Sequence, residues 1–463
     1  MDQNSAMSRR EILGTAPVGR LMVKFAVPSI IAMLVSALYN IVDQVFIGQA
    51  VGTLGNAATN IAFPLAMSCT AIGLLFGIGG ASNFNLHMGR REYDKAPFFV
   101  GNAASMLCIG GVLLTLVTEL FLTPMLRAFG SPEEVLPYAL EYVRITAIGF
   151  PFLILTIGGG HLIRADGSPV MTMICSLSGA IINTFLDALF VFGFHWGMAG
   201  AAAATVIGQI FSGTLALHYI IHYKTVPLKK VHFIPRPETV LQAASLGTAS
   251  CINQLAMMAV QIVLNNSLKY YGGLSVYGSS IPIACAGIVT KVNQVFFSVV
   301  IGIGQGSQPI ESFNYGARRY GRVRKTYMLA LRAAAAVSFS SFLMFQFFPR
   351  QLLSLFGNGS EEYFQFGVRF FRIYLFCTWA NCIQPVTAQF FASIGKPVKG
   401  MFISLTRQIL FLLPIIVILP LFIGIDGIVY AGPVADLMAA VFAAVLVMFE
   451  FRDMSRLERE MNE

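Results

Sequence analysis

The feature that most constrains this chain is a series of long runs without Lys, Arg, Asp or Glu. They cover residues 44–86, 96–118, 145–163, 167–186, 188–223, 239–268 and 270–290. An α-helix crosses the hydrocarbon core of a bilayer with about 20 apolar residues, so each run has nearly that length or more. Strands of a membrane barrel would instead show alternating segments of about ten residues. The runs therefore predict membrane-spanning helices.

Composition excludes the soluble class. Only 11% of the 463 residues are charged, whereas a typical soluble protein carries about 25%. With 56% hydrophobic residues, the chain has too little polar surface to cover a soluble globule of this size. The apolar runs extend over the whole sequence, which argues against a soluble domain with a single anchor.

We expect an all-α polytopic membrane protein with twelve transmembrane helices. Their approximate spans are residues 20–47, 58–86, 97–122, 137–163, 170–193, 196–223, 238–269, 277–307, 323–348, 364–390, 400–424 and 427–451.

The positive charges of the loops predict the orientation. Lys and Arg gather in one set of alternate loops, while the other set holds only Arg127, Lys269 and Arg350. Because cytoplasmic loops are enriched in Lys and Arg, both termini are predicted to lie in the cytoplasm, with the protein in the cell (inner) membrane. The net charge of +9 is then a signal of topology and of contact with lipid headgroups, and does not indicate nucleic-acid binding.

The two halves of the chain repeat one another at an offset near 227 residues. The matching segments are 77–82 with 302–307, 87–93 with 314–320, 129–130 with 356–357, 143–145 with 371–373 and 167–170 with 395–398. Each half holds an even number of helices, so the repeat is parallel, with a pseudo-twofold axis along the membrane normal. We expect an N-terminal lobe at 1–225, a basic linker at 226–237 and a C-terminal lobe at 238–463. Two facing lobes with alternating access are typical of secondary transporters.

Two carboxyl groups lie at membrane depth in the first half: Asp43 in the first helix and Asp187 in the fifth. Asn183, four residues before Asp187, shares its helix face, and Thr205 in the sixth helix offers a hydroxyl. An ionisable group at this depth costs about 2.5–3.5 kcal/mol, which makes it a functional candidate. These oxygens could hold a proton or a hard cation such as Na⁺, or could be polar contacts between packed helices.

Other polar side chains could line the cleft between the lobes or contact a substrate. Tyr39 and Asn40 share the face of Asp43, and the second half supplies Gln254, Lys291 and Asp436. Lys291 could alternatively extend its ammonium group to the membrane surface or pack between lobes.

The second half does not repeat the pair of carboxyl groups, because no acid occurs in residues 239–310. We therefore expect cation coupling in the N-terminal lobe. Arg407 lies near the start of its helix and is expected to extend toward the membrane surface, while Asp436 could pair with a cation from a neighbouring helix. Glu119, Glu311 and Glu450 lie near helix ends and are expected at the interface.

Several segments carry a family resemblance. They are 39–48 (YNIVDQVFIG), 183–187 (NTFLD), 200–205 (GAAAAT), 308–310 (QPI) and 314–317 (NYGA). Over essentially the whole chain they resemble the multidrug and toxic compound extrusion (MATE) family, and within it the multidrug exporters of the DinF or MepA-like type.

The resemblance implies a V-shaped pair of six-helix lobes. Such a protein exports drugs, metabolites or other organic, cationic and amphipathic compounds in exchange for H⁺ or Na⁺, without a cofactor and as a monomer in the lipid bilayer. Asp43, Asn183, Asp187 and Thr205 match the positions that bind the coupling cation in one branch of the family. Another branch places acids in the seventh and tenth helices, and this sequence lacks them there.

Other function classes fit less well. No G-x-x-x-x-G-K-[ST] phosphate loop is present, which disfavours an ATP-driven pump. The six histidines are scattered along the chain and border no acidic pair, so we do not expect an enzyme. The alternative is a flippase for lipids or lipid-linked glycans from the same superfamily, for which Lys291 and Arg407 would supply a basic cleft.

Overall fold

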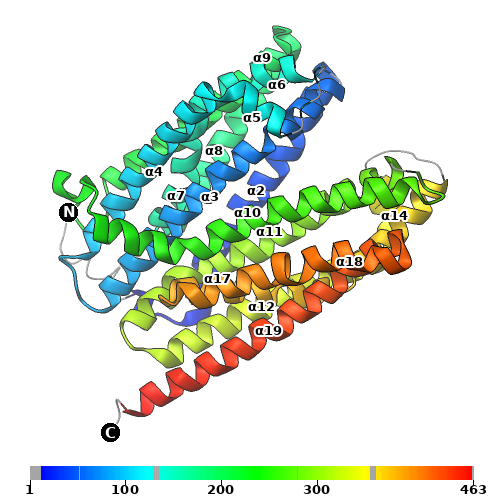
Figure 1. The fold of residues 1–463 in the computed structure, drawn as a ribbon. Coiled ribbons are helices and arrows are strands. Elements are labelled where there is room, and N and C mark those ends of the chain that lie inside the picture. Colours follow the sequence, from blue (N-terminus) through cyan, green and yellow to red (C-terminus); the bar gives the residue numbers. More distant parts are fainter. Residues whose placement is uncertain are drawn as a thin grey trace.

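The computed structural model describes residues 12–51, 53–129, 131, 133, 135–278, 280–354 and 361–460. All regular elements within these residues are helices, and Figure 1 shows them as two bundles. We call α2–α9 the first lobe and α10–α19 the second lobe. The all-helical fold predicted from the apolar runs is confirmed.

The first lobe begins with two long helices, as the apolar runs predict. Its elements are α2 Val18–Ala50, α3 Thr53–Gly89, α4 Ala96–Leu120, α5 Leu122–Ala128, α6 Leu136–Thr146, η1 Ala147–Gly149, α7 Phe150–Ala165, α8 Pro169–Asp187, η2 Ala188–Gly193 and α9 Gly197–Ile221.

The second lobe follows a short 3₁₀ turn, η3 Lys230–Phe233. Its elements are α10 Pro237–Gly273, α11 Ser280–Gly316, α12 Tyr320–Phe347, α13 Pro349–Ser354, α14 Glu361–Tyr374, α15 Thr378–Asn381, α16 Ile383–Ser393, α17 Pro397–Leu405, η4 Thr406–Leu412, α18 Leu413–Ile423 and α19 Ile425–Glu460.

Eleven helical spans among the described residues are long and apolar enough to cross a membrane. The expectation of one continuous tenth helix over 364–390 is wrong, because this stretch is divided into α14, α15 and α16. The fourth span is interrupted in the same way at residues 147–149, where η1 separates α6 from α7. The two breaks, at 147–149 and 375–377, lie 228 residues apart. The same offset relates residues 167–170 to 395–398, so the two halves repeat the interruption of the helix as well as the sequence.

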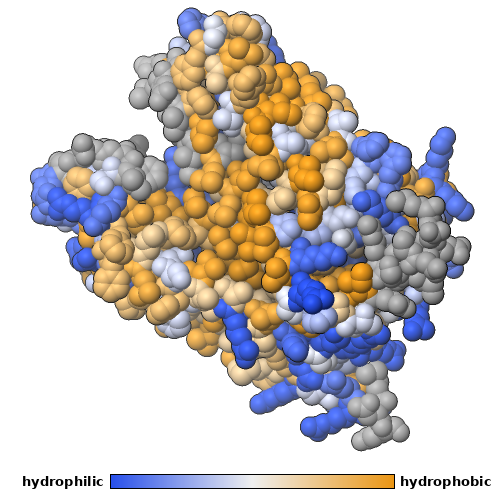
Figure 2. All heavy atoms as spheres, turned by 180° about the vertical axis from the view of Figure 1, so that it is seen from behind, coloured by the Kyte–Doolittle hydropathy of each residue, from blue (hydrophilic) through white to orange (hydrophobic). Residues whose placement is uncertain are grey.

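The surface of both lobes is apolar, as contact with lipid requires. Figure 2 shows broad hydrophobic areas over the bundles, with hydrophilic groups concentrated toward one end. Large apolar side chains such as Leu120, Phe185 and Phe422 are exposed. Membrane embedding accounts for this exposure without any soluble partner.

The lobes meet at one end and diverge at the other (Figure 1). The first described residues, ahead of α2, and the end of α19 lie at the end where the lobes meet, which we call the closed end. Glycines allow this approach between α3 and α10, because an added Cβ at Gly79 would lie 1.7 Å from the Ala243 carbonyl oxygen. At Gly247 it would lie 1.8 Å from the carbonyl oxygen of Leu75. Backbone thus packs directly against backbone.

A related contact joins α2 to α11. A Cβ at Gly306 would lie 2.5 Å from the Cα of Ala26, and one at Gly302 would lie 2.6 Å from the Cα of Ile30. These residues belong to the beginning of α2 and the later part of α11. Both glycine contacts between lobes therefore lie toward the closed end.

Side-chain hydrogen bonds reinforce the closed end. Asn314 of α11 donates through Nδ2 to the Leu13 carbonyl oxygen at 2.9 Å, and Arg322 of α12 donates to the Ala16 carbonyl oxygen at 2.7 Å. The segment ahead of α2 is thereby tied to the second lobe. Asn314 belongs to the NYGA segment of the sequence, and this hydrogen bond explains why a polar residue stands at that position.

The chain between the lobes is fastened to the first lobe. Asn102 of α4 donates to the carbonyl oxygen of His232 at 2.8 Å and accepts from the backbone N–H of Arg236 at 2.6 Å. Asp166, after α7, accepts from the backbone N–H of Thr225 at 2.7 Å. The predicted boundaries at 226 and 237 stay predictions.

We predict that Gly247→Ala destabilises the protein by about 1–3 kcal/mol, the usual cost of overpacking. The new methyl group must displace the backbone of α3, since the Leu75 carbonyl oxygen occupies its place. Thermal unfolding of the purified protein measures the effect. Gly287→Ala in α11 is the matched control, because a Cβ there meets nothing within 4 Å. Equal unfolding temperatures for the two variants would contradict this contact.

Candidate functional site

Helices α2 and α8 pack against one another and bring the two predicted carboxyl groups together. Asp43 is 8% exposed and Asp187 is fully buried. Their carboxyl groups lie close enough to interact electrostatically. The two residues belong to helices far apart in the sequence, and the packing of α2 against α8 brings them close together.

The amide and the hydroxyl predicted for this site are also present. Asn183 donates through Nδ2 to Thr205 Oγ1 at 3.2 Å, and both side chains are buried. This bond leaves the amide oxygen of Asn183 free to act as an acceptor. Asp43 Oδ1, Asn183 Oδ1 and both carboxyl oxygens of Asp187 have no hydrogen-bond donor among the described residues. The site is therefore a buried group of acceptor oxygens.

Local backbone structure explains how these atoms meet. Asp187 is the last residue of α8, and the π-helix η2 follows at once; π-segments within helices are frequent at functional sites. Helices α8 and α9 cross at two glycines, since a Cβ at Gly208 would lie 2.7 Å from the carbonyl oxygen of Gly179. This close crossing brings Thr205 of α9 to Asn183.

The chemistry of the site favours a monovalent cation or a proton. Two neighbouring carboxylates in a low-dielectric interior repel each other, and a proton or cation between them removes the repulsion. Carboxylate, amide and hydroxyl oxygens are ligands for hard cations. Within the described residues, no group of three His, Cys, Asp or Glu side chains is arranged to hold a metal ion.

The predicted cleft residues do not gather in one place. The side chains of Tyr39 and Asn40 lie outside the described part of the structure. Gln254 of α10 donates to the sulfur of Met67 on α3 at 2.7 Å, which makes it a contact between lobes. Lys291 is exposed on α11.

Asp436 pairs with a cation from a neighbouring helix, as predicted, and that cation is Arg407. Arg407 Nε donates to Asp436 Oδ1 at 2.6 Å, while the Asp436 side chain is 2% exposed and that of Arg407 is 16% exposed. The expectation that Arg407 extends toward the membrane surface is therefore wrong. A buried carboxylate needs a counter-ion, and this need outweighs the hydration of the guanidinium group.

The ion pair occupies positions of the second lobe that correspond to two glycines of the first. Arg407 and Asp436 lie 228 residues after Gly179 and Gly208. In the first lobe these positions form the glycine crossing beside Asn183. In the second lobe a fixed charge pair joins the corresponding helices, so the repeat is conserved in position and differs in chemistry.

Two glutamates that the sequence predicts at the membrane interface are buried. Glu311 and Glu450 are 1% and 0% exposed, whereas the expectation put them at the interface. Glu450 lies between Lys396 and Lys399, with the Lys399 Nζ at 2.7 Å. Lys396 and Lys399, which follow the tenth span, could have indicated that a buried acid lies nearby. No comparable residues indicate the burial of Glu311.

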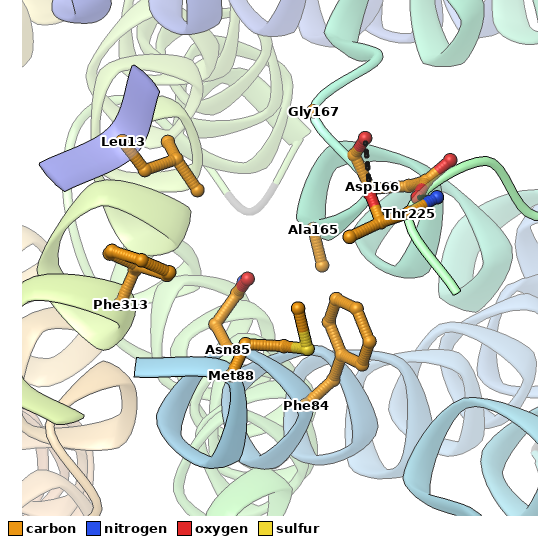
Figure 3. A pocket seen from close by; sticks show the side chains of 9 residues that line it. All are labelled: Leu13, Phe84, Asn85, Met88, Ala165, Asp166, Gly167, Thr225 and Phe313. Carbon is orange, nitrogen blue, oxygen red and sulfur yellow. Dashed lines mark hydrogen bonds between the residues drawn. The ribbon is translucent and has the colours of Figure 1, made fainter. Parts of the chain in front are cut away.

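A small cavity of about 20 Å³ lies at the closed end, enough for about one water molecule. Figure 3 shows side chains from both lobes around it: Leu13 and Phe313 lie on one side, Asp166 lies on the opposite side, and Asn85 and Met88 lie between them. It is too small for an organic substrate and marks the contact between the lobes.

Comparisons with known proteins place nearly the whole chain in one family. The MatE family profile matches residues 28–189 and 249–418. The multidrug export protein MepA of Staphylococcus saprophyticus is 23% identical over 435 residues, covering 93% of this chain and 94% of that protein. MepA of Staphylococcus aureus strain MSSA476 is 23% identical over 443 residues, 95% of each chain.

Solved structures share the fold. An outward-facing multidrug resistance MATE transporter of the MOP superfamily superposes with a TM-score of 0.88 at 20% identity, covering 96% of this chain and 98% of that one. A MOP superfamily transporter from Pyrococcus furiosus, described as having a binding pocket of reverse polarity, gives a TM-score of 0.89 at 19% identity and the same coverage. The fold is therefore the two-lobed architecture of these transporters.

We predict that Arg407→Met destabilises the protein by about 3–5 kcal/mol, because it leaves the buried Asp436 carboxylate unpaired. The double variant Arg407→Met/Asp436→Leu should regain most of this loss. Thermal unfolding of the purified protein measures both effects.

Arg350→Met is the control for this prediction, since it breaks the exposed pair with Glu361 and should cost at most about 1 kcal/mol. A single Arg407 variant as stable as this control would show that the buried pair contributes nothing.

Proposed function

The chain belongs to the MatE family, and on that premise we propose that it exports organic compounds by antiport against H⁺ or Na⁺. The two MepA relatives are named multidrug export proteins, and one structural neighbour is a multidrug resistance MATE transporter. It is a multi-pass membrane transporter and not an enzyme. The coupling ion, its site and the class of substrate are our proposals.

The observation that carries the proposal is the group of unpartnered oxygens at Asp43, Asn183 and Asp187. Desolvated acceptors without donors are costly unless a proton or cation completes them. Thr205 fixes the Asn183 amide through its hydroxyl, so the amide oxygen stays available. We assign the coupling cation to these four residues.

Binding at this site can change how the first lobe packs. The cation would join α2 to α8 and α9, and it would remove the repulsion between the carboxyl groups of Asp43 on α2 and Asp187 on α8. A ligand shifts a conformational equilibrium only through its different affinity for the two states. Export follows if the cation binds when the site faces outward and leaves when it faces the cytoplasm.

We also propose that the closed end faces the cytoplasm. The predicted cytoplasmic loops carry most of the Lys and Arg, and cytoplasmic loops of membrane proteins have this bias. The first described residues, ahead of α2, and the end of α19 lie at the closed end (Figure 1). The structure then corresponds to a state in which the lobes are closed to the cytoplasm and diverge toward the outside.

The substrates we propose are organic, amphipathic and cationic. The chain has 20 Met and 39 Phe, and such polarizable side chains can repack around different ligands. The flippase alternative loses support, because Arg407 is neutralised by Asp436 and no longer supplies a basic cleft. We propose that the monomer is the functional unit.

We predict that Asp43→Asn lowers gradient-driven efflux by about 5- to 150-fold, the effect of losing 1–3 kcal/mol of coupling free energy. Efflux of a fluorescent lipophilic cation from proteoliposomes is measured under an imposed proton gradient and, separately, a sodium gradient. The gradient that drives the wild type identifies the coupling ion. Asp94→Asn, which changes an exposed carboxyl at the closed end, is the control and should transport like the wild type.

Equal efflux by wild type and Asp43→Asn under the driving gradient would contradict the assigned site. Absence of efflux by folded wild type under both gradients would contradict antiport of such cations, and would return attention to lipid or anionic substrates.

A further inference from the structure

Glu311 of α11 is a buried carboxyl group that the proposed antiport does not use. Its side chain is 1% exposed. Ser393 of α16 donates through Oγ to Glu311 Oε2 at 2.9 Å. Glu311 Oε1 has no hydrogen-bond partner among the described residues, and no described Lys or Arg forms an ion pair with this carboxyl group.

Glu311 differs from the compensated acids of the second lobe. Glu450 is equally buried, and it lies between the ammonium groups of Lys396 and Lys399. Asp436 has the guanidinium group of Arg407. The carboxyl group of Glu311 has only the hydroxyl groups of Ser393 and Ser307 beside it. A carboxylate without a counter-ion is costly inside a protein, and binding a proton removes that cost.

The position of Glu311 links it to the contact between the lobes. Three residues earlier on α11, Gln308 donates through Nε2 to Ser82 Oγ of the first lobe at 2.8 Å. Three residues later, Asn314 donates to the Leu13 carbonyl oxygen. Glu311 therefore lies next to a contact between the lobes, Gln308 with Ser82, that must break if the closed end opens. Opening would admit water to Glu311.

Among the described residues, the ionisable groups of the surrounding helices form no ion pair with Glu311. From α7, buried His161 contacts Gln308 Oε1 at 3.3 Å, and Arg164 interacts electrostatically with His161. From α12, Tyr327 interacts with it electrostatically, and the Tyr327 hydroxyl is bonded to Thr387 at 2.7 Å. His87 of α3 contacts the carbonyl oxygen of Asn83, and Lys24 of α2 is exposed. Lys396, beyond the end of α16, is bound to Glu450.

We propose that Glu311 is a second proton-binding site, which holds a proton while the closed end is closed and releases it when that end opens. The proton is taken from water onto a carboxyl oxygen and is returned to water, so the step involves no redox change. The release on opening rests on the alternating access proposed above. A proton bound more tightly in the closed state stabilises that state, so alkaline conditions favour opening.

Infrared difference spectroscopy tests the protonation without requiring transport. Spectra of the purified full-length protein in lipid nanodiscs are compared between acidic and alkaline buffer, in the region of the protonated-carboxyl C=O stretch. Glu311→Gln should lose one component that the wild type and Glu450→Gln both retain, and that differs from the component lost in Asp43→Asn. A Glu311→Gln spectrum identical to that of the wild type would overturn the proposal.

Distances between spin labels test the link to opening. Labels are placed at exposed Tyr93 of the first lobe and exposed Arg318 of the second, in a background without the native cysteines. The wild type should shift toward longer distances as the pH rises, whereas Glu311→Gln should remain at the short distance. Glu311→Asp, which keeps a carboxyl group, should restore the shift. An unchanged pH response in Glu311→Gln would overturn the link.

The two proposals fail separately. If the infrared component is lost but the wild type shows no gradient-driven efflux, Glu311 remains a proton site and the antiport proposal fails. If efflux depends on Asp43 but the Glu311→Gln spectrum is unchanged, antiport stands and the second site fails.

Discussion

The structure depends on how charge is neutralised in an interior that water does not reach. A buried carboxylate is costly unless a cation or several donors compensate it. Asp436 has a fixed counter-ion in Arg407, and this pair joins two helices of the second lobe. Asp43, Asp187 and Glu311 keep oxygens without a donor among the described residues. We assign the ion-paired carboxyl group to helix packing, and the carboxyl groups with oxygens that lack a donor to binding of an exchangeable proton or cation.

The two lobes use one backbone plan with different chemistry. Their interrupted helices and short connecting helices recur at nearly the same offset. At corresponding positions, however, Gly179 and Gly208 form a close crossing in the first lobe, while Arg407 and Asp436 form an ion pair in the second. A crossing of glycines leaves the neighbouring oxygens of Asn183 free for a ligand. At the equivalent place in the second lobe, the counter-ion of Asp436 is the side chain of Arg407, which is covalently part of the chain and cannot exchange.

Much of this could be predicted from the sequence, because membrane helices and their acids leave strong one-dimensional signals. The pairing of Asp43 with Asp187 followed from their depth, and a partner for Asp436 was expected. The break at 375–377 was not predicted, because the stretch is as apolar as a continuous helix. The burial of Glu311 was also missed, since a position near a helix end does not reveal that α12 and α16 of the same lobe pack around it.

The most direct test of the central claim is a potentiometric titration of proton uptake by the purified protein in lipid nanodiscs. It compares the wild type with the double variant Asp43→Asn/Asp187→Asn, with and without sodium in the buffer. If these carboxyl groups hold the exchangeable cation, the double variant will take up fewer protons and sodium will no longer alter its curve. A titration curve that coincides with that of the wild type would contradict the assignment of the site to the first lobe.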